Sequence, residues 1–170
     1  MTDYVALLRG VNVGGVTIKM ADLAEVVRGL GYEDVTTVLA SGNVLFTTPD
    51  AAPAAKKALE AALRKRFGYE AWVHVLTVDA IRTLVAAYPF PRSAERHAYV
   101  VFAVKPEVRT ELLAVKVDPA IEQAKAGDGV IYWSVPKGST LDSAMGKAQS
   151  KASYKPWITT RNLNTLEKLL

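Results

Sequence analysis

The sequence predicts an α+β fold built from two subdomains, and three observations lead to that prediction. Short apolar runs alternate with segments in which apolar residues recur at helical spacing. The alternation is regular in residues 1–77 and less regular in residues 78–170. Half of the 170 residues are hydrophobic and 22% are charged, which supplies enough apolar material for a core.

The first subdomain, residues 1–77, is expected to contain four strands and two helices. An apolar run at 4–9 predicts a buried strand, and the helical spacing of residues 20–30 ends at Gly31. The other expected elements are strands at 35–40 and 44–48, a helix at 54–66 that Gly68 ends, and a strand at 71–76. This β-α-β-β-α-β order predicts a ferredoxin-like subdomain.

The second subdomain, residues 78–170, is expected to be a smaller α+β unit with basic C-terminal helices, packed with the first as one compact unit. Residues 88–91, Tyr-Pro-Phe-Pro, cannot form regular structure and suit a junction. The expected helices are 78–87, 106–115, a turn at 119–126, 141–151 with a basic face, and 162–170. The expected strands are 98–104 and 130–135.

Composition excludes several classes of protein. The chain has no cysteine, which excludes disulfides, zinc-thiolate sites, iron–sulfur clusters and thiol catalysis. The strongest apolar run, residues 99–104, is far shorter than a membrane span, and no signal-peptide pattern opens the chain. We therefore expect a cytoplasmic protein with no membrane partner.

The net charge of +4 lies entirely near the C-terminus. Residues 136–170 hold six bases and two acids, whereas residues 1–135 hold 15 of each sign. Such asymmetry suggests an anionic ligand or surface close to the C-terminus. A solvated lysine-rich face is the simpler explanation, and four net charges are few for a nucleic-acid footprint.

A glycine-rich motif follows the first expected strand, at a position where α/β proteins often hold phosphates. It lacks the Lys that a P-loop requires, because Val16 stands at that position, and it does not match G-x-G-x-x-G. The alternative is a loop that needs positive φ at its last two glycines. The candidate ligand residues here are Arg9, Gly10, Asn12, Gly14 and Gly15.

A second motif, Ser41-Gly42-Asn43, separates two expected strands. It is typical of a tight hairpin in which Gly and Asn adopt left-handed geometry. The functional alternative places this turn near the first loop, where Ser41, Gly42 and Asn43 add polar groups to one pocket.

A third motif opens the expected terminal helix. Arg161, Thr165 and Lys168 would share its polar face, and leucines its apolar face. The helix macrodipole disfavours a cation at a helix start, so a bound anion or a buried acid would offset the charge of Arg161. The candidate ligand residues here are Arg161, Asn162, Thr165 and Lys168.

Together these motifs resemble one uncharacterised bacterial family, domain of unknown function 1697. The resemblance extends over essentially the whole chain, and it departs at Leu163, where many relatives are expected to carry an aromatic residue. The residues that carry it are the stretch 7–15, Met20, Leu23, the stretch 41–44, Phe46, the stretch 160–162, Asn164, Thr165, Lys168 and Leu169. The resemblance implies an α+β fold of two subdomains, the first ferredoxin-like, and no established activity.

Other chemistry is sparse in the sequence. His74 and His97 lie in separate strand regions without a matching Ser or Asp motif, so no metal site, cofactor or catalytic constellation is expected. The turn that begins at Lys137 could bind an anion or simply cap the following helix. The aromatic residues Trp133, Tyr154 and Trp157 could stack on a base or belong to the core.

These observations predict a non-catalytic protein that binds an anionic small molecule, phosphate or nucleotide-like, in a cleft formed by the three motifs. Three alternatives stay open. The protein could be a nucleic-acid-binding module, an enzyme that acts on a phosphorylated substrate through Arg9 and Arg161, or a scaffold in which the motifs join two subdomains and Arg161 pairs with an acid.

Overall fold

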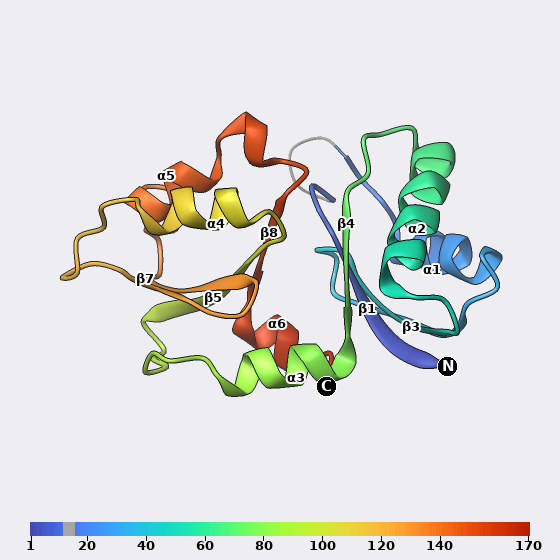
Figure 1. Cartoon of the computed structure of the whole chain (residues 1–170), viewed down its shortest axis with the longest axis horizontal. Helices are drawn as coiled ribbons and strands as arrows, with labels where there is room; N and C mark the ends of the chain where they lie inside the picture. The colour runs from blue at the N-terminus through green and yellow to red at the C-terminus, as the bar shows by residue number, and fades with distance from the viewer. Residues whose placement is uncertain (12–15) are drawn as a thin grey trace. The chain divides into compact units, whose positions relative to one another are not determined.

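A computed structural model describes residues 1–11 and 16–170. The chain forms two compact units, Met1–Arg82 with Lys168–Leu170, and Thr83–Glu167. Each unit contains one four-stranded antiparallel sheet (Figure 1). The predicted α+β fold class is therefore confirmed. None of the described helices is long and apolar enough to cross a membrane.

The first unit has the β-α-β-β-α-β order predicted from its sequence. Its elements are β1 (Thr2–Leu8), α1 (Met20–Gly29), β2 (Glu33–Val38), β3 (Asn43–Thr48), α2 (Ala52–Phe67) and β4 (Val73–Thr77). The sheet order is β2-β3-β1-β4, which places the first and third strands at the centre as in a ferredoxin-like fold. Helix α3 (Val78–Ala86) follows β4.

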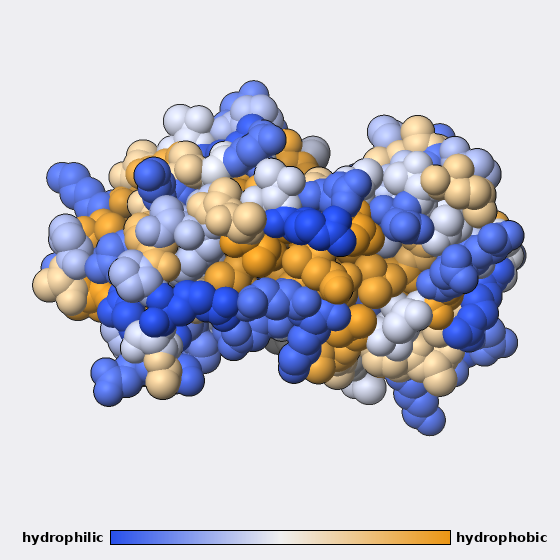
Figure 2. All heavy atoms as spheres, turned by 90° about the horizontal axis from the view of Figure 1, so that it is seen from below, coloured by the Kyte–Doolittle hydropathy of each residue, from blue (hydrophilic) through white to orange (hydrophobic). Residues whose placement is uncertain are grey.

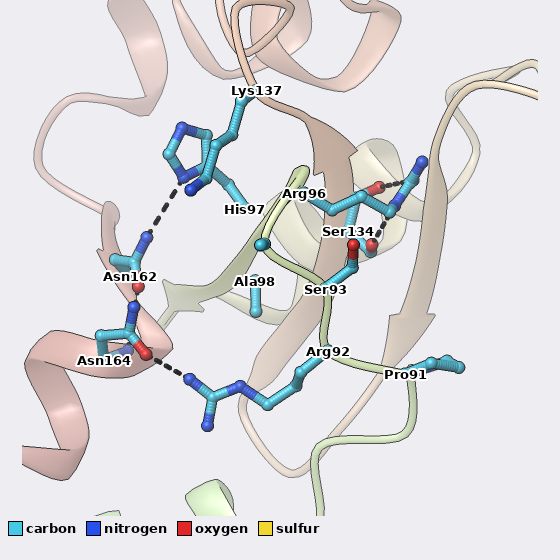
Figure 3. A pocket seen from close by; sticks show the side chains of 11 residues that line it. Pro91, Arg92, Ser93, Arg96, His97, Ala98, Ser134, Lys137, Asn162 and Asn164 are labelled. Atoms are coloured by element: carbon cyan, nitrogen blue, oxygen red, sulfur yellow. Dashed lines mark hydrogen bonds between the residues drawn. The ribbon is translucent and has the colours of Figure 1, made fainter.

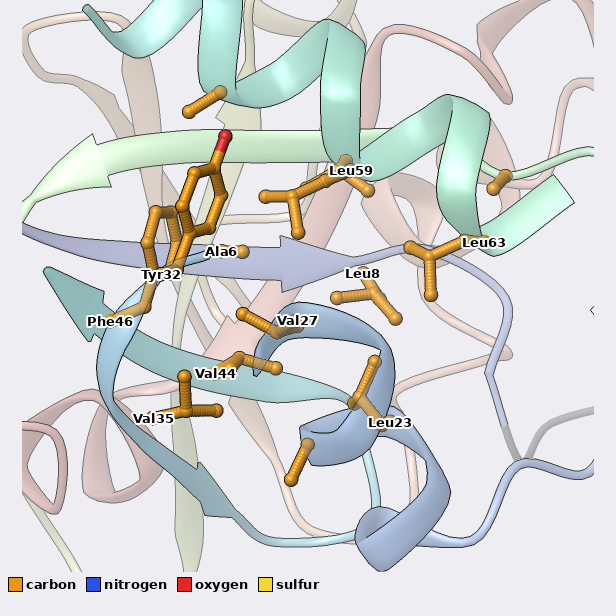
Figure 4. Packing of buried hydrophobic residues seen from close by; sticks show 14 of the residues in the cluster. Ala6, Leu8, Leu23, Val27, Tyr32, Val35, Val44, Phe46, Leu59 and Leu63 are labelled. Carbon is orange, nitrogen blue, oxygen red and sulfur yellow. The ribbon is translucent and has the colours of Figure 1, made fainter. Parts of the chain in front are cut away.

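Both helices of this unit pack on the same face of the sheet (Figures 1 and 4). Leu23 and Val27 of α1 and Leu59 of α2 are buried in one cluster with side chains of β1 and β3. The ring of Tyr32 stacks on Phe46 of β3, with 5.1 Å between centroids. Burying each such leucine contributes about 2 kcal/mol, so the amphipathic spacing in the sequence accounts for this layer.

Tyr69, just beyond α2, carries a buried hydroxyl for which the described residues provide no hydrogen-bond partner. Burial raises its pKa to about 12. In the unfolded chain this phenol ionises near its ordinary pKa of 10. Between pH 10 and 12 the folded protein therefore still holds the proton that the unfolded chain has lost. The free energy of unfolding falls as the pH rises through this range.

We expect Tyr69→Phe to raise the free energy of unfolding at pH 7 by about 1 kcal/mol, because it removes an unsatisfied buried group. The variant should also lose less stability than wild type between pH 9 and 11. Urea unfolding at several pH values tests both points. Tyr132→Phe is the control, because the Tyr132 hydroxyl donates to the carbonyl of Leu84 at 2.7 Å and its removal should destabilise. A Tyr69→Phe protein that is less stable than wild type at pH 7 would contradict the argument.

The second unit has the same topology as the first, a closer repeat than its sequence indicates. Its elements are β5 (Arg96–Ala103), α4 (Pro106–Leu113), β6 (Gln123–Ala126), β7 (Val130–Pro136), α5 (Ala144–Gln149), a 3-10 turn (Ala152–Tyr154), β8 (Ile158–Asn162) and α6 (Leu163–Glu167). The sheet order β6-β7-β5-β8 corresponds strand by strand to that of the first unit. Helices α4 and α5 pack on one face of this sheet.

The structure differs from three sequence-based expectations for this unit. The helical turn predicted at 119–126 contains strand β6, whose Ala124 pairs with Trp133 of β7. The helix predicted at 141–151 is shortened to α5, which begins after the Ser143 cap. The helix predicted at 162–170 is shortened to α6. The sequence analysis does not predict strand β8, which precedes α6, although its Ile and Thr residues favour strands.

The core of the second unit contains a buried carboxylate. Glu122 accepts hydrogen bonds from the indole Nε1 of Trp133 at 3.0 Å and from the backbone N–H groups of Ala144 at 3.0 Å and Met145 at 3.3 Å. These two N–H groups open helix α5, where a negative charge is favourable. Glu122 thus joins the segment before β6 to β7 and to α5.

Candidate functional site

A polar cavity of about 420 Å³ lies in the second unit (Figure 3). Because β5 runs antiparallel to both β7 and β8, the start of β5 and the ends of the other two strands meet at one end of the sheet. The segment before β5 and the start of α6 complete the wall. Besides Ser93 and Ser134, the polar residues that line the cavity are Arg92, Arg96, His97, Lys137, Asn162 and Asn164.

Arg96 is held rigidly in the wall of this cavity. Its Nε donates to Ser134 Oγ at 2.9 Å, and its Nη2 donates to the carbonyl of Ile121 at 2.8 Å and to Gln123 Oε1 at 3.1 Å. Three segments of the second unit are therefore joined by one guanidinium, which supplies a fixed positive charge.

His97 and Asn162 face each other across the β5–β8 edge of the cavity (Figure 3). Asn162 Oδ1 accepts the backbone N–H of Asn164 at 2.9 Å, so its Nδ2 is directed to His97 Nδ1, 3.5 Å away. This assignment makes Nδ1 the acceptor and leaves the proton of a neutral ring on Nε2. The imidazole also packs against the ring of Tyr99, with 5.3 Å between centroids.

The remaining cations come from loops. Arg92 donates to Asn164 Oδ1 and pairs with Glu167. Lys137 is exposed, and within the described residues its ammonium has no ion-pair or hydrogen-bond partner. The side chains that line the described cavity include three cations and a histidine and no carboxylate. Such a set favours an anionic ligand and can donate several hydrogen bonds to its oxygens.

The first predicted motif lies in the other unit and is described in part. Arg9 directly follows β1, is half-buried, and its backbone N–H donates to the carbonyl of Trp72 at 3.1 Å. Burial lowers the pKa of its guanidinium. Gly10 is exposed with φ +72°. The other candidates of this motif, Asn12, Gly14 and Gly15, lie outside the described residues.

The second predicted motif forms the connection from β2 to β3 and lies beside the end of β1. Leu8 N–H donates to the carbonyl of Gly42 at 2.9 Å. Gly42 has φ +87°, and a Cβ there would lie 2.9 Å from Leu8 Cβ, so both conformation and space require glycine. Asn43 is fully buried, and its Nδ2 donates to the carbonyl of Val38 at 2.8 Å and to Ser41 Oγ at 2.9 Å.

This turn differs in one respect from the expected hairpin. Leu39 and Gly42 have positive φ, and Asn43 does not. The amide of Asn43 closes the turn through its hydrogen bonds instead of adopting left-handed geometry.

The third predicted motif is not the start of a helix. Arg161 lies in β8, is 6% exposed, and its Nη1 donates to Thr159 Oγ1 at 2.6 Å and to the carbonyl of Thr160 at 3.1 Å. Burial lowers its pKa to about 10. The expected polar face of Arg161, Thr165 and Lys168 therefore does not form, and the argument from the helix macrodipole does not apply. Thr165 is half-buried in α6, and Lys168 is exposed beyond it.

Of the predicted site residues that the structure describes, Asn162 lines the cavity. The other residues of the lining are not among the candidate ligand residues of the three motifs. Lys137 belongs to the turn for which the sequence indicates either anion binding or helix capping. No local pattern singles out Arg92, Arg96 or His97. The prediction that the three motifs form one cleft stays a prediction. Within the described residues, no group of three His, Cys, Asp or Glu side chains could hold a metal ion.

The fold and the cavity define a class of protein in which two ferredoxin-like units occur in one chain. The model of a family described as "Protein of unknown function (DUF1697)" matches residues 1–132, and the chain belongs to this family. The solved structure of the conserved bacterial protein SP0830 from Streptococcus pneumoniae is similar, with a TM-score of 0.81 and 24% identity over 99% of this chain and 96% of that one. This likeness shows the fold alone. No curated protein matches the chain.

Proposed function

We propose that the protein binds a small phosphorylated metabolite, and that the cavity of the second unit is the binding site. The observation that carries the proposal is the lining: three cations, a histidine and two amides surround a cavity without a carboxylate. Arginine and lysine side chains form strong, charge-assisted hydrogen bonds to phosphate. The sequence also predicts an anionic ligand. Of the candidate ligand residues that it predicts, Asn162 lines this cavity.

The size of the cavity supports an organic phosphate as the ligand. Its volume of about 420 Å³ lies in the range of small-molecule sites and exceeds what inorganic phosphate alone would fill. The rigid Arg96 and the Asn162–His97 pair would orient the ligand, and Lys137 would close on its phosphate group as a mobile charge. Inorganic phosphate should therefore compete with the ligand but bind more weakly.

We expect Lys137→Ala to weaken the binding of a sugar phosphate or a mononucleotide about tenfold, because one charge-assisted contact of about 1.4 kcal/mol is lost. Its melting temperature without ligand should stay that of wild type, because the ammonium makes no contact within the described chain. A thermal-shift screen finds the ligand, and calorimetry compares the variants.

Lys125→Ala is the matched control, since Lys125 is exposed on β6 and does not line the cavity. It removes the same charge from the same unit. Equal loss of affinity in both variants would indicate a general charge effect and would contradict the proposed site. The same conclusion would follow if no phosphorylated compound raised the melting temperature.

A second candidate function is an enzyme that acts on the phosphorylated ligand, and the position of His97 favours it. The hydrogen bond from Asn162 leaves the Nε2–H of the neutral ring free to donate a hydrogen bond to a phosphate oxygen, which would stabilise the negative charge that develops during phosphoryl transfer. A phosphatase and nucleotidyl-transfer screen tests this candidate. Turnover that His97→Asn abolishes without loss of ligand binding would support it, and absence of turnover would exclude it for the compounds screened.

A further inference from the structure

The aromatic residues near the C-terminus separate into two groups in the structure. Trp133 is 1% exposed and Tyr154 is 7% exposed, so both belong to the core of the second unit. Trp157 is 37% exposed. A large aromatic side chain at the surface has a hydrophobic ring that is available to a partner.

The position of Trp157 is fixed by its backbone, in the segment that leads from α5 into β8 (Figure 1). Its carbonyl accepts the N–H of Val104 at 3.0 Å, and its own N–H donates to the carbonyl of Tyr154 at 2.8 Å. The next residue, Ile158, pairs with Ala103 of β5. An exposed indole on a rigid backbone costs little conformational entropy when it binds a planar partner.

One lysine lies over this indole, and others occur in the segment around it. Lys105 Nζ lies over the ring of Trp157, 4.9 Å from its centroid, and Lys151 Nζ lies 5.1 Å from the ring centroid of Tyr154. Lys155 is exposed in the same segment. Residues 143–157 contain three lysines and no Asp or Glu.

A carboxylate from α4 reaches this surface. Glu111 accepts a hydrogen bond from the hydroxyl of Tyr154 at 2.5 Å, and the pKa of this phenol is raised by that bond. This hydrogen bond from a neutral phenol does not cancel the charge of Glu111, but Lys105, Lys151 and Lys155 outnumber it and leave the surface positive.

We propose that Lys105, Lys151, Lys155 and Trp157, here called the Trp157 surface, bind single-stranded nucleic acid. A base would take the place of Lys105 Nζ over the indole, and the displaced Lys105 would contact the phosphates together with Lys151 and Lys155. Aromatic rings flanked by basic side chains bind single strands in this way with little sequence preference. An acidic protein would match the charge alone and would leave the exposed ring without a planar partner. Tryptophan also inserts at membrane interfaces, so vesicle binding is one of the outcomes that the experiment distinguishes.

The test is fluorescence anisotropy of labelled twelve-residue oligo(U) and oligo(dT) with the full chain. We expect saturable binding at 50 mM salt, weakened about tenfold by Trp157→Ala and largely restored in Trp157→Phe, which keeps a ring. Lys155→Ala should reduce the slope of log K against log salt by about 0.7, the value for one phosphate contact on a single strand. Lys125→Ala, with the same change of charge outside this surface, should bind as wild type.

Three outcomes would overturn the proposal. The first is no binding to either oligonucleotide at 50 mM salt. The second is unchanged binding in Trp157→Ala with wild-type circular dichroism and melting temperature. The third is binding to vesicles rich in phosphatidylserine, or to polyglutamate, that Trp157→Ala weakens while oligonucleotides do not bind. Lys137→Ala should leave oligonucleotide binding unchanged, so this proposal and that of a phosphorylated metabolite can fail separately.

Discussion

Replacement of Glu122 by alanine is expected to lower the free energy of unfolding by about 3–5 kcal/mol. The substitution leaves the indole N–H of Trp133 and two N–H groups of α5 without their acceptor, in a region where Glu122 itself is 2% exposed. It also removes the negative charge that lies against the N-terminus of α5. Loss of one side chain should therefore loosen the attachment of a helix to the sheet of the second unit.

Urea unfolding followed by the near-ultraviolet circular dichroism of tryptophan measures this effect. Glu122→Gln keeps one acceptor oxygen and should cost less than Glu122→Ala. Glu95→Ala is the control, because Glu95 is exposed and its substitution should change stability by less than about 0.5 kcal/mol. If Glu122→Ala and Glu95→Ala were equally stable, the carboxylate would not be the connection that its contacts indicate.

Gly146→Ala is expected to destabilise the second unit by about 3 kcal/mol or more. A Cβ at Gly146 would lie 1.8 Å from the carbonyl oxygen of Thr140 and 3.0 Å from Ser143 Oγ. The first of these atoms is backbone, so α5 or the loop before it has to move. That movement would also disturb the contacts of Glu122 with the start of α5.

Gly29→Ala is the matched control, because Gly29 also lies in a helix and a Cβ there would meet no atom within 4 Å. We expect this control to be neutral or to stabilise by up to about 1 kcal/mol, since alanine is the better helix former. Thermal unfolding of both variants measures the difference. Similar melting temperatures would show that α5 adjusts without cost and would contradict the steric argument.

The sequence by itself determined the elements of the first unit, because their signals are local. The apolar spacing of Leu23 and Val27, and that of Leu59 and Leu63, specifies which face of each helix is buried. The intervening apolar runs predict strands, and the order of the elements leads to the ferredoxin-like topology. The recognised motifs also predicted the family to which the chain belongs.

Several elements of the second unit could be assigned only from the tertiary structure, because strand pairing there overrides weak local preferences for helix or strand. Gln123–Ala126 is only four residues long and contains no β-branched or aromatic residue, yet it forms β6 through its register with β7. The sequence pattern predicts Arg161 at a helix start, whereas pairing with Val100 of β5 places it in a buried strand. Neither outcome follows from residues close in sequence.

The candidate site was decided by the same long-range pairing. His97, Lys137 and Asn162 are separated by up to 65 residues along the chain, and antiparallel pairing of β5 with β7 and β8 brings them to one end of a sheet. The sequence determined that polar, basic residues are concentrated near the C-terminus. Which of them line a cavity, and which, like Arg161, are buried in a strand, depends on contacts between distant segments that periodicity and motif spacing do not encode.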